Sequence, residues 1–300
     1  MFNCSNKQEF NKICGDTPLI KVSEKLYAKL ETYNPTGSVK DRMISYVVSN
    51  ALSVGLIVAD TILCEATSGN SGISLSAIAA SMGLRCVIFM PSNMSEERKQ
   101  MMRVYGAEIV EAPPGDFETA IKMRDDFLLA NPGSWSPMQF SNPENIECHQ
   151  NKTAPEIAMA LWLMNEKWSA FIHGSGTGGT IEGVRRYLQT PKGFIKKEDT
   201  PPKVCMVIPA ESPHGIQGIG DGRDFLAKQS DMDGIIHVKT EDAINRAKLF
   251  VKESGILIGI SSGANLVASE RWIEENNPRG VVVTLLCDRG ERYLTLFEHS

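Results

Sequence analysis

The chain has 300 residues, a formal net charge of -5 and a charged content of 22%, without a long run of either sign. This length allows one large packed domain or two smaller ones. The charge balance argues against nucleic acid or a membrane surface as the main partner. No apolar run is long enough to cross a bilayer, and the first residues lack the apolar core of a signal peptide, so we expect a cytoplasmic protein.

The seven cysteines predict neither a disulfide framework nor a structural zinc site, because no two form a C-x-x-C pair. Four fall in apolar, strand-like runs and should be buried: Cys64, Cys86, Cys205 and Cys287. Three fall in polar segments and should be more reactive: Cys4, Cys14 and Cys148. The five histidines are scattered without an H-E-x-x-H pattern, so no metal site is expected.

Strand-like and helix-like segments alternate along the chain. The pattern predicts strands over residues 26–30, 62–64, 85–90, 108–111, 170–173, 204–208 and 281–286. It predicts helices over residues 39–48, 72–82, 95–105, 117–130, 153–165, 179–188, 241–253 and 264–275. Near-continuous apolar strands between helices indicate an α/β fold with mostly parallel sheets. Ligands of such sheets bind at the carboxyl ends of strands, in the loops that enter helices.

The first such loop covers residues 34–42 and follows the first expected strand. Pro35 and Gly37 predict a turn, and Ser38 is the expected N-cap of the next helix. Lys40 therefore falls in the first helical turn, where the helix dipole should lower the pKa of its ammonium group. A lysine with a lowered pKa is a candidate amine nucleophile. A solvated surface lysine is the ordinary interpretation of this stretch alone, so the argument for chemistry depends on other sites.

The second loop, residues 65–72, joins a strand to a helix and is rich in hydroxyl side chains. Hydroxyls, a glycine and the N–H groups of a helix start suit a carboxylate or phosphate ligand. An ordinary capping turn is the alternative, since Ser, Thr and Asn are common N-caps. The loop holds more such residues than capping needs, which favours a binding site.

The third loop, residues 173–180, is glycine-rich and also runs from a strand into a helix. Glycines let backbone N–H groups approach an anion closely, and Thr177 and Thr180 add hydroxyl donors, so the expected ligand is a phosphate. The same stretch matches G-x-G-x-x-G, which raises the alternative of a dinucleotide site, at Gly174, Gly176 and Gly179. His173 ends the strand and is expected to be a structural histidine.

The dinucleotide interpretation is weak because its acidic partner is misplaced. That partner should end the next strand, roughly 20 residues further on. Glu198 and Asp199 precede the strand, whereas Glu211 comes too late. A P-loop is excluded because no lysine follows these glycines.

A helix-start lysine, a hydroxyl-rich anion loop and a phosphate-binding loop can belong to one site. A cofactor with an aldehyde and a phosphate would join Lys40 to the glycine-rich loop. Pyridoxal phosphate, held as a lysine Schiff base, is that cofactor.

At these residues the chain resembles the cysteine synthase (O-acetylserine sulfhydrylase) family of fold-type II pyridoxal-phosphate enzymes. The matching motifs come in family order at residues 34–42 (NPTGSVKDR), 67–72 (TSGNSG), 176–180 (GTGGT) and 259–263 (GISSG). Two further stretches resemble the B-type branch, at residues 90–95 (MPSNMS) and 287–294 (CDRGERYL). The similarity covers nearly the whole chain.

The resemblance implies a tryptophan synthase β-like fold with two domains, each a mostly parallel sheet flanked by helices. Residues 1–40 and 146–300 would form a larger cofactor-binding domain. Residues 41–145 would form a smaller, mobile substrate-binding domain that closes when the substrate carboxylate binds. The family expectation for the assembly is a homodimer.

The resemblance also implies roles for single residues. Lys40 would hold the cofactor as an internal aldimine and then move the α-proton, Asn70 would hydrogen-bond the cofactor ring oxygen, and Ser261 would meet the pyridine nitrogen. The cofactor phosphate would be bound by Gly176, Thr177, Gly178, Gly179 and Thr180. The amino-acid carboxylate would be bound by Thr67, Ser68, Gly69, Asn70, Ser71 and Gln139. A neutral hydroxyl at the pyridine nitrogen does not favour a protonated ring, which suits β-elimination.

The reaction implied is a β-replacement that makes L-cysteine from O-acetyl-L-serine and sulfide, or another sulfur nucleophile, through an aminoacrylate intermediate. Ping-pong kinetics should follow. Ser71 stands where the family usually has threonine, and Ala154 where it usually has glycine. The glycine-rich residues 213–233 are longer than most connections, which predicts a functional loop. Its first part, residues 213–223, is expected at the entrance, where Arg223 is either a contact for a phosphorylated donor or a solvated surface residue.

The motifs do not separate this activity from related β-replacements with O-phosphoserine or L-serine as donor. Cystathionine β-synthase and the diaminopropionate-forming synthases are such relatives. A non-catalytic binding or regulatory protein is an alternative of a different class, which the intact Lys40 and phosphate-binding loop oppose. A nicotinamide oxidoreductase that uses the glycine-rich loop is the remaining alternative.

Overall fold

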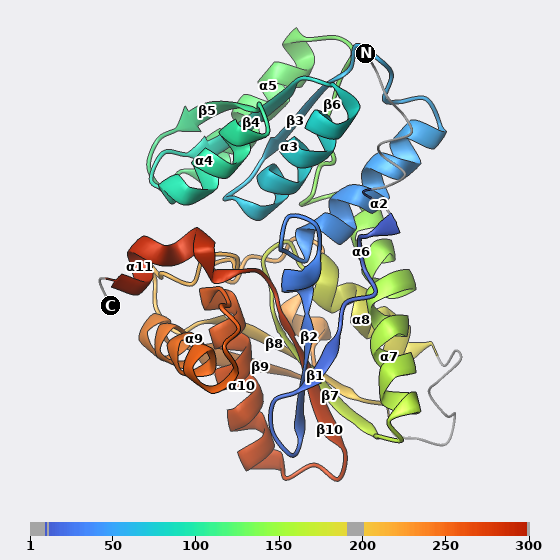
Figure 1. The fold of residues 1–300 in the computed structure, drawn as a ribbon, viewed down its shortest axis with the longest axis vertical. Helices are drawn as coiled ribbons and strands as arrows, with labels where there is room; N and C mark the ends of the chain where they lie inside the picture. The colour runs from blue at the N-terminus through green and yellow to red at the C-terminus, as the bar shows by residue number, and fades with distance from the viewer. Residues whose placement is uncertain (1–9, 11, 191–200, 299–300) are drawn as a thin grey trace. The chain divides into compact units, whose positions relative to one another are not determined.

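The computed structural model describes residue 10 and residues 12–190 and 201–298, which form two compact units (Figure 1). Among the described residues, the smaller unit comprises residues 10, 12–14 and 34–142, and the larger unit comprises residues 15–33, 143–190 and 201–298. The expected domains, residues 1–40 with 146–300 and residues 41–145, stay a prediction, while the two units divide the described chain after residues 14, 33 and 142. At residue 34 the chain passes from the larger unit into the smaller one, in the turn before Lys40. Closure of one unit on the other stays a prediction.

A four-stranded parallel sheet, in the order β5-β4-β3-β6, forms the centre of the smaller unit. Its strands are β3 (Ile62–Ala66), β4 (Cys86–Pro91), β5 (Glu108–Ala112) and β6 (Ser134–Trp135). Its helices are α2 (Lys40–Ser53), α3 (Asn70–Met82), α4 (Glu96–Val104) and α5 (Phe117–Ala130). Both faces of the sheet are covered, as the apolar strands predict.

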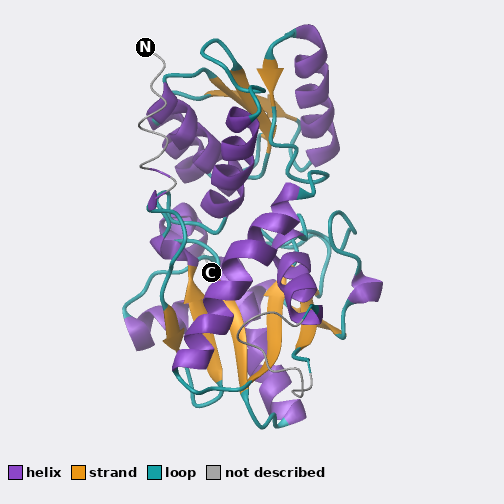
Figure 2. Cartoon of the chain, turned by 90° about the vertical axis from the view of Figure 1, so that its right-hand side faces the viewer, coloured by secondary structure: helices purple, strands orange, loops and turns teal. Residues whose placement is uncertain are grey.

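Alternate strand residues of the smaller unit pack on opposite faces of its sheet. Cys64 and Phe89 belong to an apolar cluster with Ala120 of α5. Leu63 and Ile88 belong to a second cluster, which contains buried residues of α2, α3 and α4. The sheet is therefore a layer between α5 and the other three helices, as Figure 2 shows.

A six-stranded sheet, in the order β1-β2-β10-β7-β8-β9, forms the centre of the larger unit. Its strands are β1 (Leu19–Lys21), β2 (Leu26–Leu30), β7 (Trp168–Gly174), β8 (Lys203–Pro209), β9 (Gly234–Val238) and β10 (Val281–Leu286). The longer helices are α7 (Ala154–Leu163), α8 (Gly179–Gln189), α9 (Thr240–Ser254) and α10 (Ile260–Asn276). Shorter helical pieces are η1 (Glu31–Tyr33), α6 (Glu144–Cys148), the π-helical turn η2 (His149–Thr153), η3 (Gln229–Asp231), η4 (Gly290–Tyr293) and α11 (Leu294–Glu298).

Every described strand pair of this sheet is parallel except β1 with β2. Helices α9 and α10 lie side by side (Figure 1) and pack against one face of the sheet. Their buried apolar residues form one continuous cluster with those of the strands. Helix α8 contacts β7 and β8 on the other face, where α7 joins β2 through a 2.8 Å ion pair between Glu156 and Lys29. The predicted α/β class, with helices around mostly parallel sheets, is confirmed in both units.

Several predicted elements have the observed bounds, namely β2, β10 and α5. Other expectations were wrong. Ser38 does not cap α2, because Val39 occupies the N-cap position and no side chain caps it. The expected helix over residues 153–165 is preceded by α6 and the π-helical turn, and this helical packing buries Cys148, which we expected to be reactive. The four cysteines predicted to be buried are buried, and Cys4 lies outside the described residues.

None of the described helices is both long and apolar enough to cross a membrane. Likewise, the described residues contain no cluster of three or more histidine, cysteine, aspartate and glutamate side chains that could hold a metal ion.

Candidate active site

Lys40 is the first residue of α2 in the smaller unit, and it is half-buried. The turn before it is held by the next residue, Asp41, whose buried carboxylate accepts from Thr36 N at 2.7 Å and from Thr36 Oγ1 at 2.5 Å. The predicted position of Lys40 at a helix start is thus confirmed, although Asp41 and Thr36, rather than Ser38, fix the turn. Its role as the amine nucleophile stays a prediction.

The predicted carboxylate loop, residues 67–71, joins β3 to the N-terminus of α3 in the same unit. Its backbone is held in place by Thr67 Oγ1, which accepts from Gly69 N at 3.0 Å, and by Arg98, whose Nη1 donates to Ser68 O at 3.1 Å. Gly69 is required, because a Cβ there would lie 2.4 Å from Arg98 Cδ. The N–H groups of Ser68 and Ser71 donate to no atom of the described residues, so they can bind an anion.

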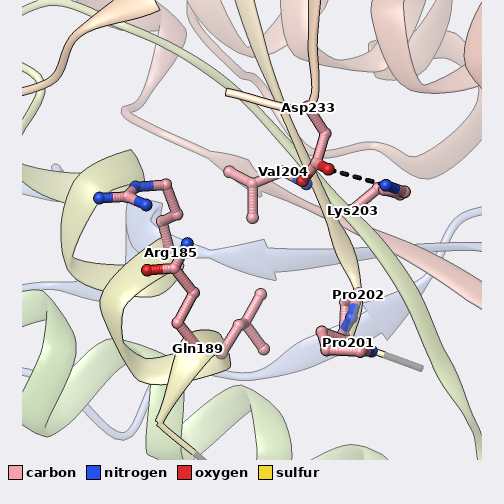
Figure 3. Close-up of a pocket in the computed structure, with 8 residues that line it drawn as sticks. Arg185, Gln189, Pro201, Pro202, Lys203, Val204 and Asp233 are labelled. Atoms are coloured by element: carbon pink, nitrogen blue, oxygen red, sulfur yellow. Dashed lines mark hydrogen bonds and ion pairs between the residues drawn. The ribbon is translucent and has the colours of Figure 1, made fainter. Parts of the chain in front are cut away.

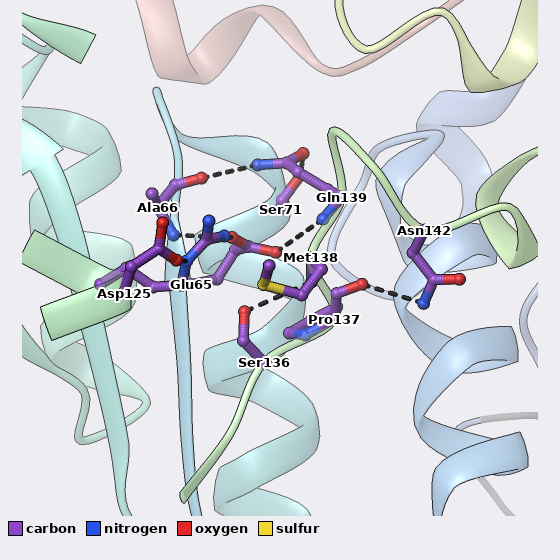
Figure 4. A network of polar contacts seen from close by, with 10 residues as sticks. Glu65, Ala66, Ser71, Asp125, Ser136, Pro137, Met138, Gln139 and Asn142 are labelled. Carbon is purple, nitrogen blue, oxygen red and sulfur yellow. Dashed lines mark hydrogen bonds and ion pairs between the residues drawn. The ribbon is translucent and has the colours of Figure 1, made fainter. Parts of the chain in front are cut away.

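Gln139 lies against this loop, as predicted, but both ends of its amide are already engaged (Figure 4). Ser71 Oγ donates to Gln139 Oε1 at 2.6 Å, and Gln139 Nε2 donates to Ala66 O at 2.8 Å. Its backbone N–H donates to Glu65 Oε2 at 3.0 Å. This arrangement makes Gln139 a support of the loop, and its role as a carboxylate ligand stays a prediction.

The sequence reasoning missed Glu65 and Arg124, which anchor this network. Glu65 is fully buried, and its Oε1 lies 2.8 Å from Arg124 Nη1 on α5. Burial raises the pKa of the Glu65 carboxyl, and the Arg124 charge together with the N–H groups of Gln139 and Ala66 counteracts part of that rise. In the sequence Glu65 directly follows an apolar run, and a glutamate buried there needs a partner that the sequence does not identify.

The phosphate loop, residues 176–180, follows β7 and enters α8 in the larger unit. Gly178 is the N-cap of α8, with φ 87°. Within the described residues, the N–H groups of Gly176, Thr177 and Gly178 have no acceptor. Three orphan donors at a helix N-terminus fit a phosphate, so these residues fit the phosphate end of the predicted cofactor.

The predicted functional loop, residues 213–233, packs on the phosphate loop. Gly220 N donates to Ser175 O at 2.8 Å, and Leu226 N donates to Thr177 O at 3.0 Å. A Cβ on Gly176 would lie 2.6 Å from Gly218 O. These residues therefore hold the phosphate loop in place, and a position at the entrance stays a prediction. Arg223 is exposed beside Asp221, with its Nε 3.5 Å from Asp221 Oδ2.

Replacing Gly178 with alanine should weaken both the fold and cofactor binding. The positive φ costs a non-glycine residue about 1–2 kcal/mol, and the new Cβ would lie 2.5 Å from Ala227 N, so the loop must shift. Gly255→Ala is the matched control, because Gly255 has φ 73° and open space around its Cβ position. We expect Gly255→Ala to lower only the melting temperature, whereas Gly178→Ala also lowers cofactor affinity. Equal effects on cofactor affinity would contradict this account of the loop.

Ser261 occupies the first turn of α10 in the larger unit and is buried. Gly218 lies between it and the phosphate loop, because a Cβ on Gly218 would lie 3.5 Å from Ser261 Oγ. The first turn of α10 carries no acidic residue. A neutral hydroxyl at a helix N-terminus fits an unprotonated pyridine nitrogen, since the dipole disfavours a cation there.

The residues of the rival dinucleotide site have structural partners. His173 Nδ1 lies 3.1 Å from Asn265 Nδ2, which agrees with the prediction of a structural histidine. Glu211 Oε1 accepts from Thr240 N at 2.6 Å at the start of α9. Glu198 and Asp199 lie outside the described residues.

A separate pocket lies between α8 and β8 (Figure 3). Its lining includes none of the predicted site residues. Its charged groups are already paired, with Lys203 Nζ 2.8 Å from Asp233 Oδ1 and Arg185 Nε 2.7 Å from Glu182 Oε2. The glycine-rich loop therefore stays the predicted site of the cofactor phosphate.

Comparison with known proteins decides the family. The sequence profile described as "Pyridoxal-phosphate dependent enzyme" matches residues 11–288. This chain belongs to that enzyme family. Its cofactor is therefore pyridoxal phosphate, and the predicted relationship is confirmed. A probable cysteine synthase of Bacillus subtilis is 35% identical over 298 residues, which is 94% of each chain.

Two solved structures of this family are also similar to the chain. A hydrogen sulfide-producing enzyme from Fusobacterium nucleatum is 32% identical with a TM-score of 0.87, over 98% of this chain and 91% of that one. An O-acetylserine dependent cystathionine beta-synthase from Helicobacter pylori is 31% identical with a TM-score of 0.86, over 95% of this chain and 96% of that one. The family and fold are thus shared among proteins that differ in their sulfur chemistry.

Proposed function

We propose that this enzyme is a cysteine synthase, which makes L-cysteine from O-acetyl-L-serine and sulfide by β-replacement. The observation that carries the proposal is the loop of residues 67–71, which offers N–H groups and hydroxyls to an amino-acid carboxylate at a helix start. The cysteine synthase relatives at about the same chain length support the same activity. The named reaction and each residue role below belong to this proposal.

This mechanism gives each of the predicted site residues a task. Gly176, Thr177 and Gly178 bind the cofactor phosphate through their N–H groups, and Ser261 meets the pyridine nitrogen. Thr67, Ser68, Gly69, Asn70 and Ser71 hold the substrate carboxylate, with Asn70 also bonding the cofactor ring oxygen. Bound pyridoxal phosphate supplies an electron sink for the bond broken at the α-carbon of the amino acid.

Lys40 is the residue that moves the proton. Its Nζ takes the α-proton as the acetate leaves the β-carbon, and returns a proton to the α-carbon after sulfide has added. A neutral amine is the form that accepts a proton.

A carboxylate in place of Ser261 should slow the reaction. Ser261→Asp would stabilise a protonated pyridine nitrogen, which favours a longer-lived carbanion over loss of the β-substituent. We expect kcat to fall at least about tenfold, or about 1.4 kcal/mol in barrier, whereas Ser261→Ala, which adds no charge, keeps most of the activity. Steady-state kinetics with O-acetylserine measure this, and equal losses in both variants would oppose the role of ring neutrality.

The second candidate is a related β-replacement with another donor or acceptor. The similarity to an O-acetylserine dependent cystathionine beta-synthase favours homocysteine as the alternative acceptor. Product analysis separates the candidates when the holoenzyme is given each donor (O-acetylserine, O-phosphoserine, L-serine) with each acceptor (sulfide, homocysteine). We expect the highest kcat/KM for cysteine formation from O-acetylserine and sulfide. A higher value for cystathionine formation would replace this proposal by the second candidate.

We also propose that the enzyme is a homodimer that pairs through α7. This helix ends in neighbouring exposed apolar side chains, among them Trp162 at 57% and Leu163 at 69% exposure. Contiguous apolar patches of this kind mark interaction surfaces. Light scattering should show a dimer for the native chain and a monomer for Trp162→Glu with Leu163→Glu. Leu129→Glu, at a lone exposed leucine of α5, should leave the dimer intact. A monomeric native chain would refute this proposal.

A further inference from the structure

Two polar side chains that no role explains lie directly behind the phosphate loop in the larger unit. Asn145 and His149 are each about 1% exposed. Asn145 Nδ2 lies 3.1 Å from Thr177 Oγ1, and His149 Nε2 lies 3.2 Å from Thr180 Oγ1. On the other side of the ring, His149 Nδ1 lies 2.9 Å from Thr153 Oγ1. Both threonine hydroxyls of the phosphate loop therefore have a buried partner behind them.

Two glycines of α8 allow this close approach. A Cβ on Gly179 would lie 2.1 Å from Asn145 Oδ1, and a Cβ on Gly183 would lie 2.6 Å from His149 Cβ. Gly183 follows Thr180 by three residues, so both lie on one face of α8. His149 starts the π-helical turn η2, a type of turn that is frequent at functional sites. The fold thus packs Asn145 and His149 against the start of α8, where a residue with a Cβ at position 179 or 183 would leave no room for them.

The donors around Thr177 determine where its hydroxyl hydrogen points. Thr177 Oγ1 accepts from Asn145 Nδ2 at 3.1 Å and from Gly179 N at 3.3 Å. Neither donor can accept the hydroxyl hydrogen. The hydrogen of Thr177 is therefore available to an acceptor bound in the loop.

Whether the Thr180 hydroxyl donates to His149 or accepts from it depends on which ring nitrogen of His149 carries the proton. If Nδ1 carries it, Thr180 must donate to Nε2, and Thr153 accepts from Nδ1. The Thr153 hydroxyl hydrogen would then have no acceptor among the described residues, although Thr153 is fully buried. If Nε2 carries the proton, Thr153 donates to Nδ1, and Thr180 accepts from Nε2. The hydroxyl hydrogen that lacks an acceptor on His149 is then that of Thr180, in the phosphate loop.

Burial decides between these arrangements. A buried hydroxyl hydrogen without an acceptor has a free-energy cost, because it has lost its hydrogen bond to water. In the Nδ1–H arrangement this cost falls on Thr153 whether or not the cofactor is bound. In the Nε2–H arrangement a phosphate in the loop removes it, because the phosphate accepts from Thr180.

We propose that Asn145 and His149 are positioning residues that make the hydroxyls of Thr177 and Thr180 donors to the cofactor phosphate, with His149 in its neutral Nε2–H form. Side chains that approach from behind thus set the direction of hydroxyls that contact the phosphate in front. The inference rests on the proposed phosphate site, but not on the identity of the amino-acid donor.

The protonation state of His149 tests the proposal in the native holoenzyme. In protein labelled with ¹⁵N-histidine, the ring nitrogens of each histidine report which one carries the proton. His149→Gln identifies the His149 signals by their loss. We expect Nε2–H with Nδ1 as an acceptor. A neutral Nδ1–H ring, or a ring protonated at both nitrogens, would overturn the proposal.

Cofactor affinity is the second test, with pyridoxal as the probe that lacks the phosphate. His149→Leu should weaken pyridoxal phosphate binding about tenfold, and leave pyridoxal binding unchanged. His149→Gln, whose Nε2 can still donate to Thr180, should restore most of the affinity. Thr180→Val should lose as much as His149→Leu, and the double variant should lose no more, because both act through one hydroxyl.

Three results would contradict the inference. They are an equal loss of affinity for pyridoxal, full additivity of His149→Leu with Thr180→Val, and no difference between the leucine and glutamine variants. If His149→Leu fails to fold, Thr153→Val provides the test, because it removes the donor to Nδ1. We expect it to lower the Nε2–H population and to weaken binding of pyridoxal phosphate only. A chain inactive with O-acetylserine would refute the proposed donor without changing any of these results.

Discussion

Replacing Lys40 with alanine should abolish cysteine formation while leaving the fold intact. In the proposed mechanism the variant loses the amine that holds the cofactor and moves the α-proton. Loss of a general acid–base group alone slows reactions by about 10²- to 10⁴-fold, and loss of the covalent link should add to this. Lys40 is half-buried at the first residue of α2, where alanine is a good helix former, so the melting temperature should change little.

Borohydride trapping gives a direct measurement for this prediction. Reduction of the holoenzyme should fix the cofactor to the peptide that contains Lys40, and mass spectrometry identifies that peptide. Lys239→Ala is the matched control, because Lys239 is an exposed lysine at the N-cap of α9. We expect this control to keep full labelling and turnover. Labelling at another lysine, or turnover by Lys40→Ala near that of the native enzyme, would refute the assignment.

Replacing Arg124 with leucine should cost the smaller unit much of its stability. The Arg124 side chain is 5% exposed and its partner Glu65 is 0% exposed, so the change leaves a buried carboxylate without its counter-ion. Removing one partner of such a pair costs about 3–5 kcal/mol. Denaturant unfolding measures this. Lys122→Leu on the same helix is the control, because its pair with Asp126 is exposed and worth about 0.3–0.5 kcal/mol.

Arg124→Leu should also weaken substrate binding at the carboxylate loop, residues 67–71. Glu65 holds the backbone of Gln139, and Gln139 in turn holds Ser71, so Arg124→Leu should raise the KM for the amino-acid substrate. Adding Glu65→Gln to Arg124→Leu removes the uncompensated charge and should recover part of both losses. A single variant as stable as the native chain, or a double variant less stable than Arg124→Leu, would show that the pair does not anchor this network.

The continuous apolar runs made much of the fold predictable. β2, β10 and α5 have the predicted bounds because apolar period and flanking turn residues agree there. β1 and β6 have only 3 and 2 residues, too few for a period to appear. β9 lies at the end of a glycine-rich segment, with only Val238 buried, and its strand conformation depends on pairing with β8.

The loops of the site were predictable for a different reason. The hydroxyls and glycines of the loops at residues 67–71 and 176–180 lie where strands meet helices, and this position follows from the α/β pattern. The residues behind the loops were not predictable. Arg124 lies 59 residues from Glu65, and His149 lies 31 residues from Thr180, so only the tertiary fold brings each pair together. His149 also sits in a π-helical turn, which no sequence period indicates.

The visible absorption of the purified holoenzyme tests the central claim most directly. The account predicts a band from the lysine-bound cofactor that shifts when O-acetylserine is added and returns when sulfide follows, with one L-cysteine formed per cycle. Lys40→Ala should show no such cycle. A band that ignores O-acetylserine but responds to another β-substituted serine, or a cycle that yields no cysteine, would contradict the cysteine synthase assignment.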